Sequence, residues 1–137
     1  MQYRPDAKEI LSTIQDLLMK EILPKLEDDE LLSYKTLVSW NMLGVISREF
    51  EKDEDLFLAE FESLQSINNL KNDKELSTED FKSLPKIVKI QKLRDLNQKL
   101  VETIRKDKVP DINSKIWLHV KQTLKNNLSI SNPRFNT

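Results

Sequence analysis

The chain has 137 residues, of which 33% are charged and 38% hydrophobic, and its formal net charge is −1 at pH 7. It contains no cysteine and one glycine, which excludes disulfides and thiolate chemistry and disfavours tight β-hairpins and phosphate-binding loops. This length is enough for one domain with a core that needs no crosslinks, so we expect a single helical domain over residues 1–137.

The first predicted helix begins at a capping box formed by Asp6 and Glu9, or one step earlier with Pro5 as its first residue. Pro24 is expected to kink or end this helix. Between them, apolar residues recur at spacings of three and four, which is the pattern of one helical face: Ala7, Ile10, Leu11, Ile14, Leu17, Leu18 and Ile22.

The acidic run at residues 27–30 suits the first turn of a second helix, because carboxylates there face the positive end of the helix dipole. This helix is predicted to run to about Glu51. Its apolar residues lie on all sides, and a helix of this kind is expected to be buried on all sides. We therefore predict that it is the central helix, with Gly44 letting a neighbour approach closely. Its apolar residues point in almost every direction around the axis: Leu37, Val38, Trp40, Met42, Leu43, Val45 and Ile46.

The remaining helices are predicted from their apolar spacing and their caps. A polar connector is expected at residues 68–73, and no alternation of period two extends beyond a few residues. The predicted fold class is all-α, a single helical bundle of about five to six helices with helix two central. The later helices run from about Glu54 to Leu70, from a cap at Ser77 to a stop at Pro85, from Lys86 to before Pro110, and from a cap at Asn113 or Ser114 to near Leu128.

Both ends of the chain and the second helix carry a recognisable pattern. The start reads Arg4-Pro5-Asp6-Ala7-Lys8-Glu9-Ile10-Leu11, the second helix contains Asn41 and then Arg48-Glu49, and the chain ends in Asn132-Pro133-Arg134-Phe135. In these features it resembles an uncharacterised family of small all-helical bacterial proteins with an Arg-Pro-x-Ala-x-Glu-Leu-Leu start and an Asn-Pro-Arg-Tyr end. Ile10 and Phe135 depart from that pattern, and Trp40 stands where a small residue is typical. The resemblance implies gene neighbours that encode acyl-CoA dehydrogenases and aminoglycoside-phosphotransferase-like kinases, and it implies no activity.

No residue pattern in the sequence carries catalytic chemistry. His119 has Ile116 and Lys115 three and four residues before it, where a helical metal site of the Glu-x-x-His type needs a carboxylate. We expect a structural or surface histidine, with a metal ligand as the alternative. The acidic cluster at residues 49–55 lacks the glycine of a calcium loop and is interpreted as a helix end followed by the first turn of the next helix. No cofactor, metal site or catalytic residue is expected, and the balance of these observations is against an enzyme.

Asn41 lies on a line of the second helix that is expected to face the core. A buried amide must find hydrogen-bond partners, and two interpretations stay open. Asn41 either fixes the packing register as a core amide, or lines an anion pocket with Arg48. In the second case Arg4 and Arg134 are the further expected ligand contacts.

Charge is unevenly distributed along the chain. Residues 1–85 hold 10 basic and 19 acidic side chains, a net of −9, whereas residues 86–137 hold 12 and 4, a net of +8. The basic half either complements the acidic half within the chain or forms a binding surface. Nucleic acid is disfavoured as the ligand, because neither interleaved aromatic residues nor a helix-turn-helix signal accompanies the basic residues.

The most consistent function is a non-enzymatic accessory module that binds a partner protein, and the resemblance suggests a kinase-like phosphotransferase or an acyl-CoA dehydrogenase as that partner. The alternative is a protein or enzyme that binds a CoA-type or phosphorylated acyl molecule in an arginine-lined pocket. The tail Asn132–Phe135 is expected to dock on the bundle or to recognise the partner. The longest apolar-dense stretch is half a membrane span, so we expect no membrane insertion and a cytoplasmic location. A homodimer remains open, with Leu56, Phe81 and Val88 as its seam.

Overall fold

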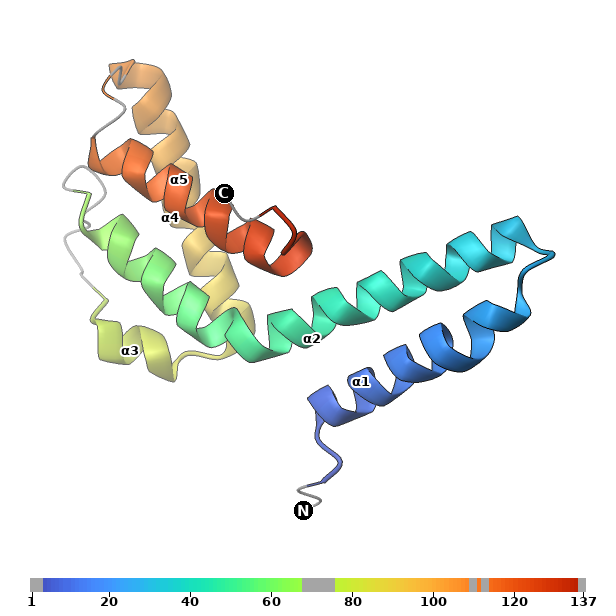
Figure 1. Ribbon diagram of the computed structural model, residues 1–137. Coiled ribbons are helices and arrows are strands. Elements are labelled where there is room, and N and C mark those ends of the chain that lie inside the picture. Colours follow the sequence, from blue (N-terminus) through green and yellow to red (C-terminus); the bar gives the residue numbers. More distant parts are fainter. Residues whose placement is uncertain (1–3, 68–75, 109–110, 112–113, 136–137) are drawn as a thin grey trace. The chain divides into compact units, whose positions relative to one another are not determined.

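The computed structural model describes residues 4–67, 76–108, 111 and 114–135 (Figure 1). Within this part of the chain all regular structure is helical and no strand occurs, so the predicted all-α class is confirmed. The described residues form five α-helices: α1 (Ala7–Asp16), α2 (Glu30–Gln65), α3 (Thr78–Ser83), α4 (Lys86–Asp107) and α5 (Lys115–Ser131).

The start of α1 confirms the capping box. The Asp6 carboxylate accepts a hydrogen bond from the Glu9 amide at 2.8 Å, and the Glu9 carboxylate accepts one from the Asp6 amide at 3.0 Å. After α1 the chain continues as a π-helical segment (Leu17–Ile22) and a 3₁₀ turn (Leu23–Lys25) that contains Pro24. The helical path therefore ends where proline removes a backbone donor.

Helix α2 is uninterrupted over 36 residues, and the predicted break between Glu51 and Glu54 is wrong. The dense charge there was interpreted as a helix end, but glutamate and lysine are good helix formers and the segment contains neither glycine nor proline. Two lysines also pair with carboxylates of this charged segment. Lys8 Nζ lies 3.0 Å from Glu51 Oε1, and Lys89 pairs with Glu54.

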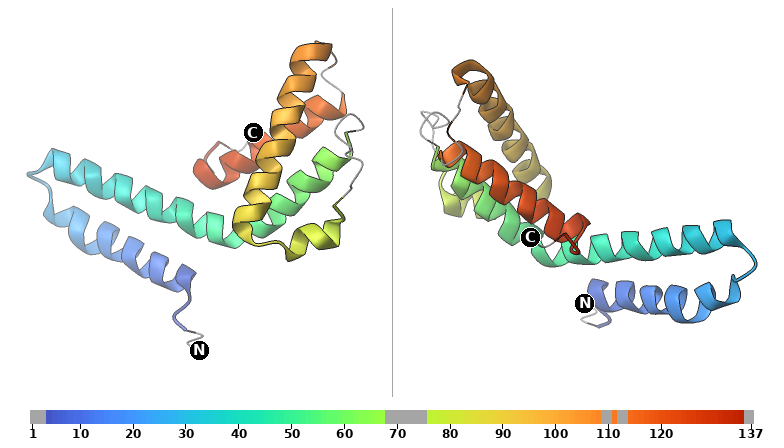
Figure 2. Two further views of the ribbon diagram at one scale, coloured as in Figure 1. Left: turned by 180° about the vertical axis from the view of Figure 1, so that it is seen from behind. Right: turned by 45° about the horizontal axis from the view of Figure 1, so that its top comes forward.

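The contacts divide the chain into two compact units, residues 1–53 and residues 54–137. The N-terminal unit is a helical hairpin in which α1 runs antiparallel to the first part of α2 (Figure 2). The C-terminal unit contains the end of α2 together with α3, α4 and α5. Helix α2 contributes to both units, which agrees with the prediction that the second helix is central. That residues 1–137 form a single domain stays a prediction.

The buried apolar core of the described residues lies in the C-terminal unit. The rings of Phe61 and Phe81 stack with centroids 4.0 Å apart and planes 5° from parallel. Phe81 is 1% exposed, so its suggested place in a dimer seam is wrong. Helix α3 begins after the Ser77 cap and carries Phe81, whose ring contacts that of Phe61. The core comprises Phe61, Leu64, Ile67, Phe81, Leu93, Leu100 and Ile116.

The caps of the later helices agree with the predicted positions. The Ser77 hydroxyl accepts a hydrogen bond from the Asp80 amide at 3.0 Å, and the Ser114 hydroxyl accepts one from the Trp117 amide at 3.4 Å. Helix α4 begins directly after Pro85. The alternative cap at Asn113, the connector at residues 68–73 and the predicted helix end at Leu70 lie outside the described residues.

Candidate functional site

The uncovered apolar surface of the N-terminal unit is the most prominent candidate site. Among its described residues no apolar side chain counts as fully buried, and twelve large ones are exposed. The hairpin has only two helices, so each covers one face of the other and leaves the rest accessible. The exposed side chains are Ile10, Ile14, Leu17, Met19, Leu31, Leu32, Tyr34, Leu37, Val38, Met42, Ile46 and Phe50.

One face of α2 packs against α1, as Gly44 predicts. A Cβ built on this buried glycine would lie 3.0 Å from Gln15 Nε2 and 3.1 Å from Arg48 Nη1. The Gln15 amide also donates a hydrogen bond to the Trp40 carbonyl at 2.9 Å. The close approach predicted for Gly44 is therefore confirmed, and it identifies the side of α2 that α1 covers.

Four exposed apolar side chains that recur every three or four residues along α2 form what we call the outer stripe: Leu31, Tyr34, Val38 and Met42. These side chains are 63%, 66%, 37% and 59% exposed, so the prediction that this helix is buried all round is wrong. Between Glu30 and Arg48 the only charged residue of α2 is Lys35. Protein interfaces have this composition at their centres, where charge is depleted and tyrosine and methionine are enriched.

The residues predicted to bind an anion differ in their surroundings. Arg4 is exposed and its Nε lies 3.7 Å from Glu9 Oε1, whereas Arg48 is half-buried and its guanidinium lies beside Gly44. Asn41 is exposed, so the expectation that it faces the core is wrong. That expectation assumed that other helices surround this helix, whereas among the described residues of the hairpin only α1 packs against it. Arg134 belongs to the other unit. An anion pocket built from these four residues stays a prediction.

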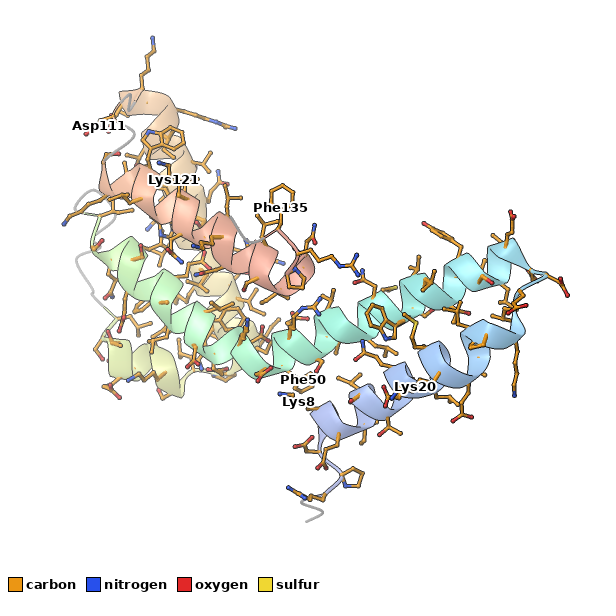
Figure 3. The ribbon with its side chains drawn as sticks, viewed as in Figure 1. Lys8, Lys20, Phe50, Asp111, Lys121 and Phe135 are labelled. Atoms are coloured by element: carbon orange, nitrogen blue, oxygen red, sulfur yellow. The ribbon has the colours of Figure 1, made fainter. Side chains whose placement is uncertain are left out.

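The tail after α5 forms a backbone turn. The Asn132 amide donates to the Leu128 carbonyl at 2.8 Å, and the Phe135 amide donates to the Asn132 carbonyl at 3.0 Å. Phe135 is nevertheless 62% exposed, so the expectation that its ring docks on the helices is wrong. Its side chain is labelled in Figure 3. Because the backbone amide of Phe135 forms this turn, residue 135 lies close to the end of α5.

A second polar site lies inside the C-terminal unit, around the sole histidine of the sequence. His119 is 3% exposed, and its Nδ1 shares a hydrogen bond of 2.8 Å with the Ser63 hydroxyl. Its Nε2 lies 3.5 Å from the Thr123 hydroxyl. Burial lowers the pKa of His119 from its ordinary value of 6.5, and the charge of Glu60 opposes this shift. The ring is buried, which excludes the surface position that the sequence left open, and sequence spacing could not identify Ser63 because it lies 56 positions away.

This burial predicts how stability depends on pH. The folded pKa of His119 lies below its unfolded value, so the unfolded chain binds more protons as the pH falls below about 6.5. The stability that the neutral ring contributes is present above that pH and is lost below it. We expect the free energy of unfolding, measured in urea, to fall less between pH 7 and pH 5 in His119→Gln than in the parent chain. Equal slopes would contradict a buried neutral imidazole.

Contacts between α2 and α4 join the acidic and basic halves of the chain. The ammonium of Lys89, which is 4% exposed, donates a hydrogen bond to the Glu54 carboxylate. Asn97 Nδ2 donates to Glu60 Oε1 at 2.7 Å. At these residues the basic half of the chain therefore pairs with the acidic half and does not form a free basic surface. A groove of about 530 Å³, open to solvent, lies beside them and is lined by Phe57, Glu60, Ile90, Leu93, Arg94, Asn97, Gln98 and Val101.

The described residues contain no group of three or more histidine, cysteine, aspartate or glutamate side chains placed to hold a metal ion. In the same part of the chain no helix is both long enough and apolar enough to cross a membrane.

These observations define an all-α protein with an exposed apolar hairpin. Residues 24–135 match the family described as Domain of unknown function (DUF6285), and the chain belongs to this family. The matched range contains the whole of α2 and leaves α1 outside it. Searches of curated proteins and of solved structures gave no significant match.

Proposed function

We propose that the protein is a non-enzymatic accessory module that binds a partner protein through the outer stripe of the N-terminal hairpin. The observation that supports this function is the group of twelve exposed large apolar side chains in a unit whose described residues include no fully buried apolar one. Large exposed apolar patches on soluble proteins mark interaction sites, and four of these side chains follow one another along α2 in the outer stripe.

The energetics favour a covered stripe. Burying one Leu, Val or Met side chain contributes about 1.5–3 kcal/mol. Leu31 and Met42 are each more than half exposed, so most of that contribution is still available to a partner. A partner on the stripe would also pack against a further face of α2. The apolar residues of this helix point in almost every direction, which predicts more than one packing neighbour.

The resemblance noted above suggests the class of partner, namely a kinase-like phosphotransferase or an acyl-CoA dehydrogenase. Binding of a CoA-type or phosphorylated acyl molecule is the alternative, and it has weaker support. The groove beside α4 is open, and the carboxylate of Glu60 faces it together with Arg94. A carboxylate at that position opposes an anionic ligand.

The test is a calorimetric titration of purified proteins of those two classes, from the same organism, with the parent chain and two variants. Met42→Lys places a charge on the outer stripe. Leu118→Lys is the matched control, because Leu118 is 53% exposed on α5 in the other unit. We expect Met42→Lys to weaken binding at least tenfold and Leu118→Lys to leave the dissociation constant within about twofold, as expected for a central and a peripheral position. Equal binding by all three chains, or binding by none, would contradict the proposal.

A further inference from the structure

We propose that the open groove between α2 and α4 binds an α-amino acid with a large apolar side chain. In this site Glu60 receives the ammonium group, Arg94 receives the carboxylate, and the side chain of the ligand covers the apolar floor of the groove. The groove belongs to the C-terminal unit and shares no residue with the outer stripe. Binding at this groove is therefore independent of the partner proposed above.

Both helices contribute apolar side chains to the floor of the groove. Phe57 lies on α2, and Ile90, Leu93 and Val101 lie on α4. Leu93 is 5% exposed and belongs to the core, whereas Val101 is 39% exposed, so the floor rests on packed residues and is open to solvent. The volume of about 530 Å³ is typical of a site for a small molecule. An apolar group that covers this floor is held there by the hydrophobic effect.

Glu60 supplies a fixed negative charge at the groove. Asn97 Nδ2 donates one hydrogen bond to Glu60 Oε1 at 2.7 Å and another to the Leu93 carbonyl at 2.9 Å. The neutral amide of Asn97 therefore holds the carboxylate in position without cancelling its charge. A carboxylate accepts several hydrogen bonds, so the remaining lone pairs of Glu60 can accept from an ammonium group.

Arg94 lines the same groove from α4 and supplies a positive charge. Among the described residues, its side chain has neither an ion pair nor a hydrogen bond with Glu60 or with any other residue. Its donors are therefore available, and a guanidinium binds a carboxylate through two parallel hydrogen bonds. The groove thus carries one positive and one negative charge that are not paired with each other.

This arrangement of charges selects a zwitterion. A simple anion is attracted by Arg94 and repelled by Glu60, and a simple cation meets the opposite balance. An α-amino acid carries an ammonium group and a carboxylate on one carbon, so it can pair with both residues at once. Its side chain then lies over the floor, where burial supplies affinity while the two charges fix the orientation. A polar side chain would lose hydration there without gaining a hydrogen bond, so the apolar amino acids are favoured.

The first experiment titrates the isotope-labelled full chain with phenylalanine and follows the backbone amide signals by nuclear magnetic resonance. We expect saturable shifts centred on Arg94, Asn97 and Gln98, with a dissociation constant on the order of 1 mM for so small a ligand in an open site. Phenylpropionate lacks the ammonium group and phenylethylamine lacks the carboxylate. Each is expected to bind about three- to tenfold more weakly, because one charge-assisted hydrogen bond is lost. No saturable shift with phenylalanine, or equal binding of either analogue, would overturn the inference.

The second experiment assigns each charge of the ligand to its residue. In Glu60→Gln we expect phenylalanine to lose its advantage over phenylpropionate, and in Arg94→Gln to lose its advantage over phenylethylamine. Binding of the respective analogue by each variant shows that the floor is intact. Arg105→Gln is the matched control, because Arg105 is exposed on α4 outside the groove, and it should keep the dissociation constant within about twofold. Full discrimination in either groove variant, or its loss in Arg105→Gln, would contradict the site.

Discussion

Replacing Phe81 with alanine is expected to lower the free energy of unfolding of the C-terminal unit by about 3–5 kcal/mol. Phe81 is 1% exposed, and its ring stacks on Phe61 at 4.0 Å. The substitution removes this contact and leaves a cavity at the centre of the core. Each unit contains one of the two tryptophans, so in a Trp40→Phe background the fluorescence of Trp117 reports the C-terminal unit during urea unfolding.

The matched control is Phe135→Ala. This phenylalanine is 62% exposed, so its removal is expected to change stability by no more than about 0.5 kcal/mol. Similar destabilisation by the two substitutions would show that the ring of Phe135 is buried after all. A Phe81→Ala chain as stable as the parent would contradict the described core.

Replacing Asp55 with proline is expected to destabilise the protein by about 3 kcal/mol or more. Asp55 lies inside the continuous helix α2, where proline removes a backbone hydrogen bond and its ring clashes with the preceding turn. Had α2 broken between Glu51 and Glu54 as the charge pattern predicts, Asp55 would stand in the first turn of a new helix, where proline is well tolerated. Far-ultraviolet circular dichroism during urea unfolding distinguishes the two cases.

Asp55→Ala serves as the control for this substitution. The aspartate is exposed, and alanine is the better helix former, so we expect a change within about 0.5 kcal/mol. A proline variant that unfolds at the same urea concentration as the alanine variant would mean that α2 is interrupted near this position.

The helix starts could be predicted because they depend on neighbours in sequence. The caps at Asp6, Ser77 and Ser114 each accept a hydrogen bond from an amide three residues ahead, so residue type and spacing determine them. The break in α2 was mispredicted because charge density alone does not end a helix. Continuity there depends on helix propensity, which favours glutamate and lysine.

The candidate sites could be predicted only in part. Asn41 was predicted to face the core and is exposed, because whether its line on α2 is covered depends on how many helices pack around α2. Phe135 and Phe81 have the same side chain, and one is exposed while the other is buried. Their local sequences do not distinguish them, because burial is decided by elements far along the chain.

The sequence by itself determined the all-α class, most helix boundaries and the close approach at Gly44, since periodicity, caps and the lack of a side chain act within a few residues. Only the tertiary structure decided that the apolar core gathers in the C-terminal unit, that Ser63 contacts His119, and that the outer stripe is left exposed. Each of these depends on contacts between residues far apart in sequence, and their free energies arise from burial and packing, which no local pattern records.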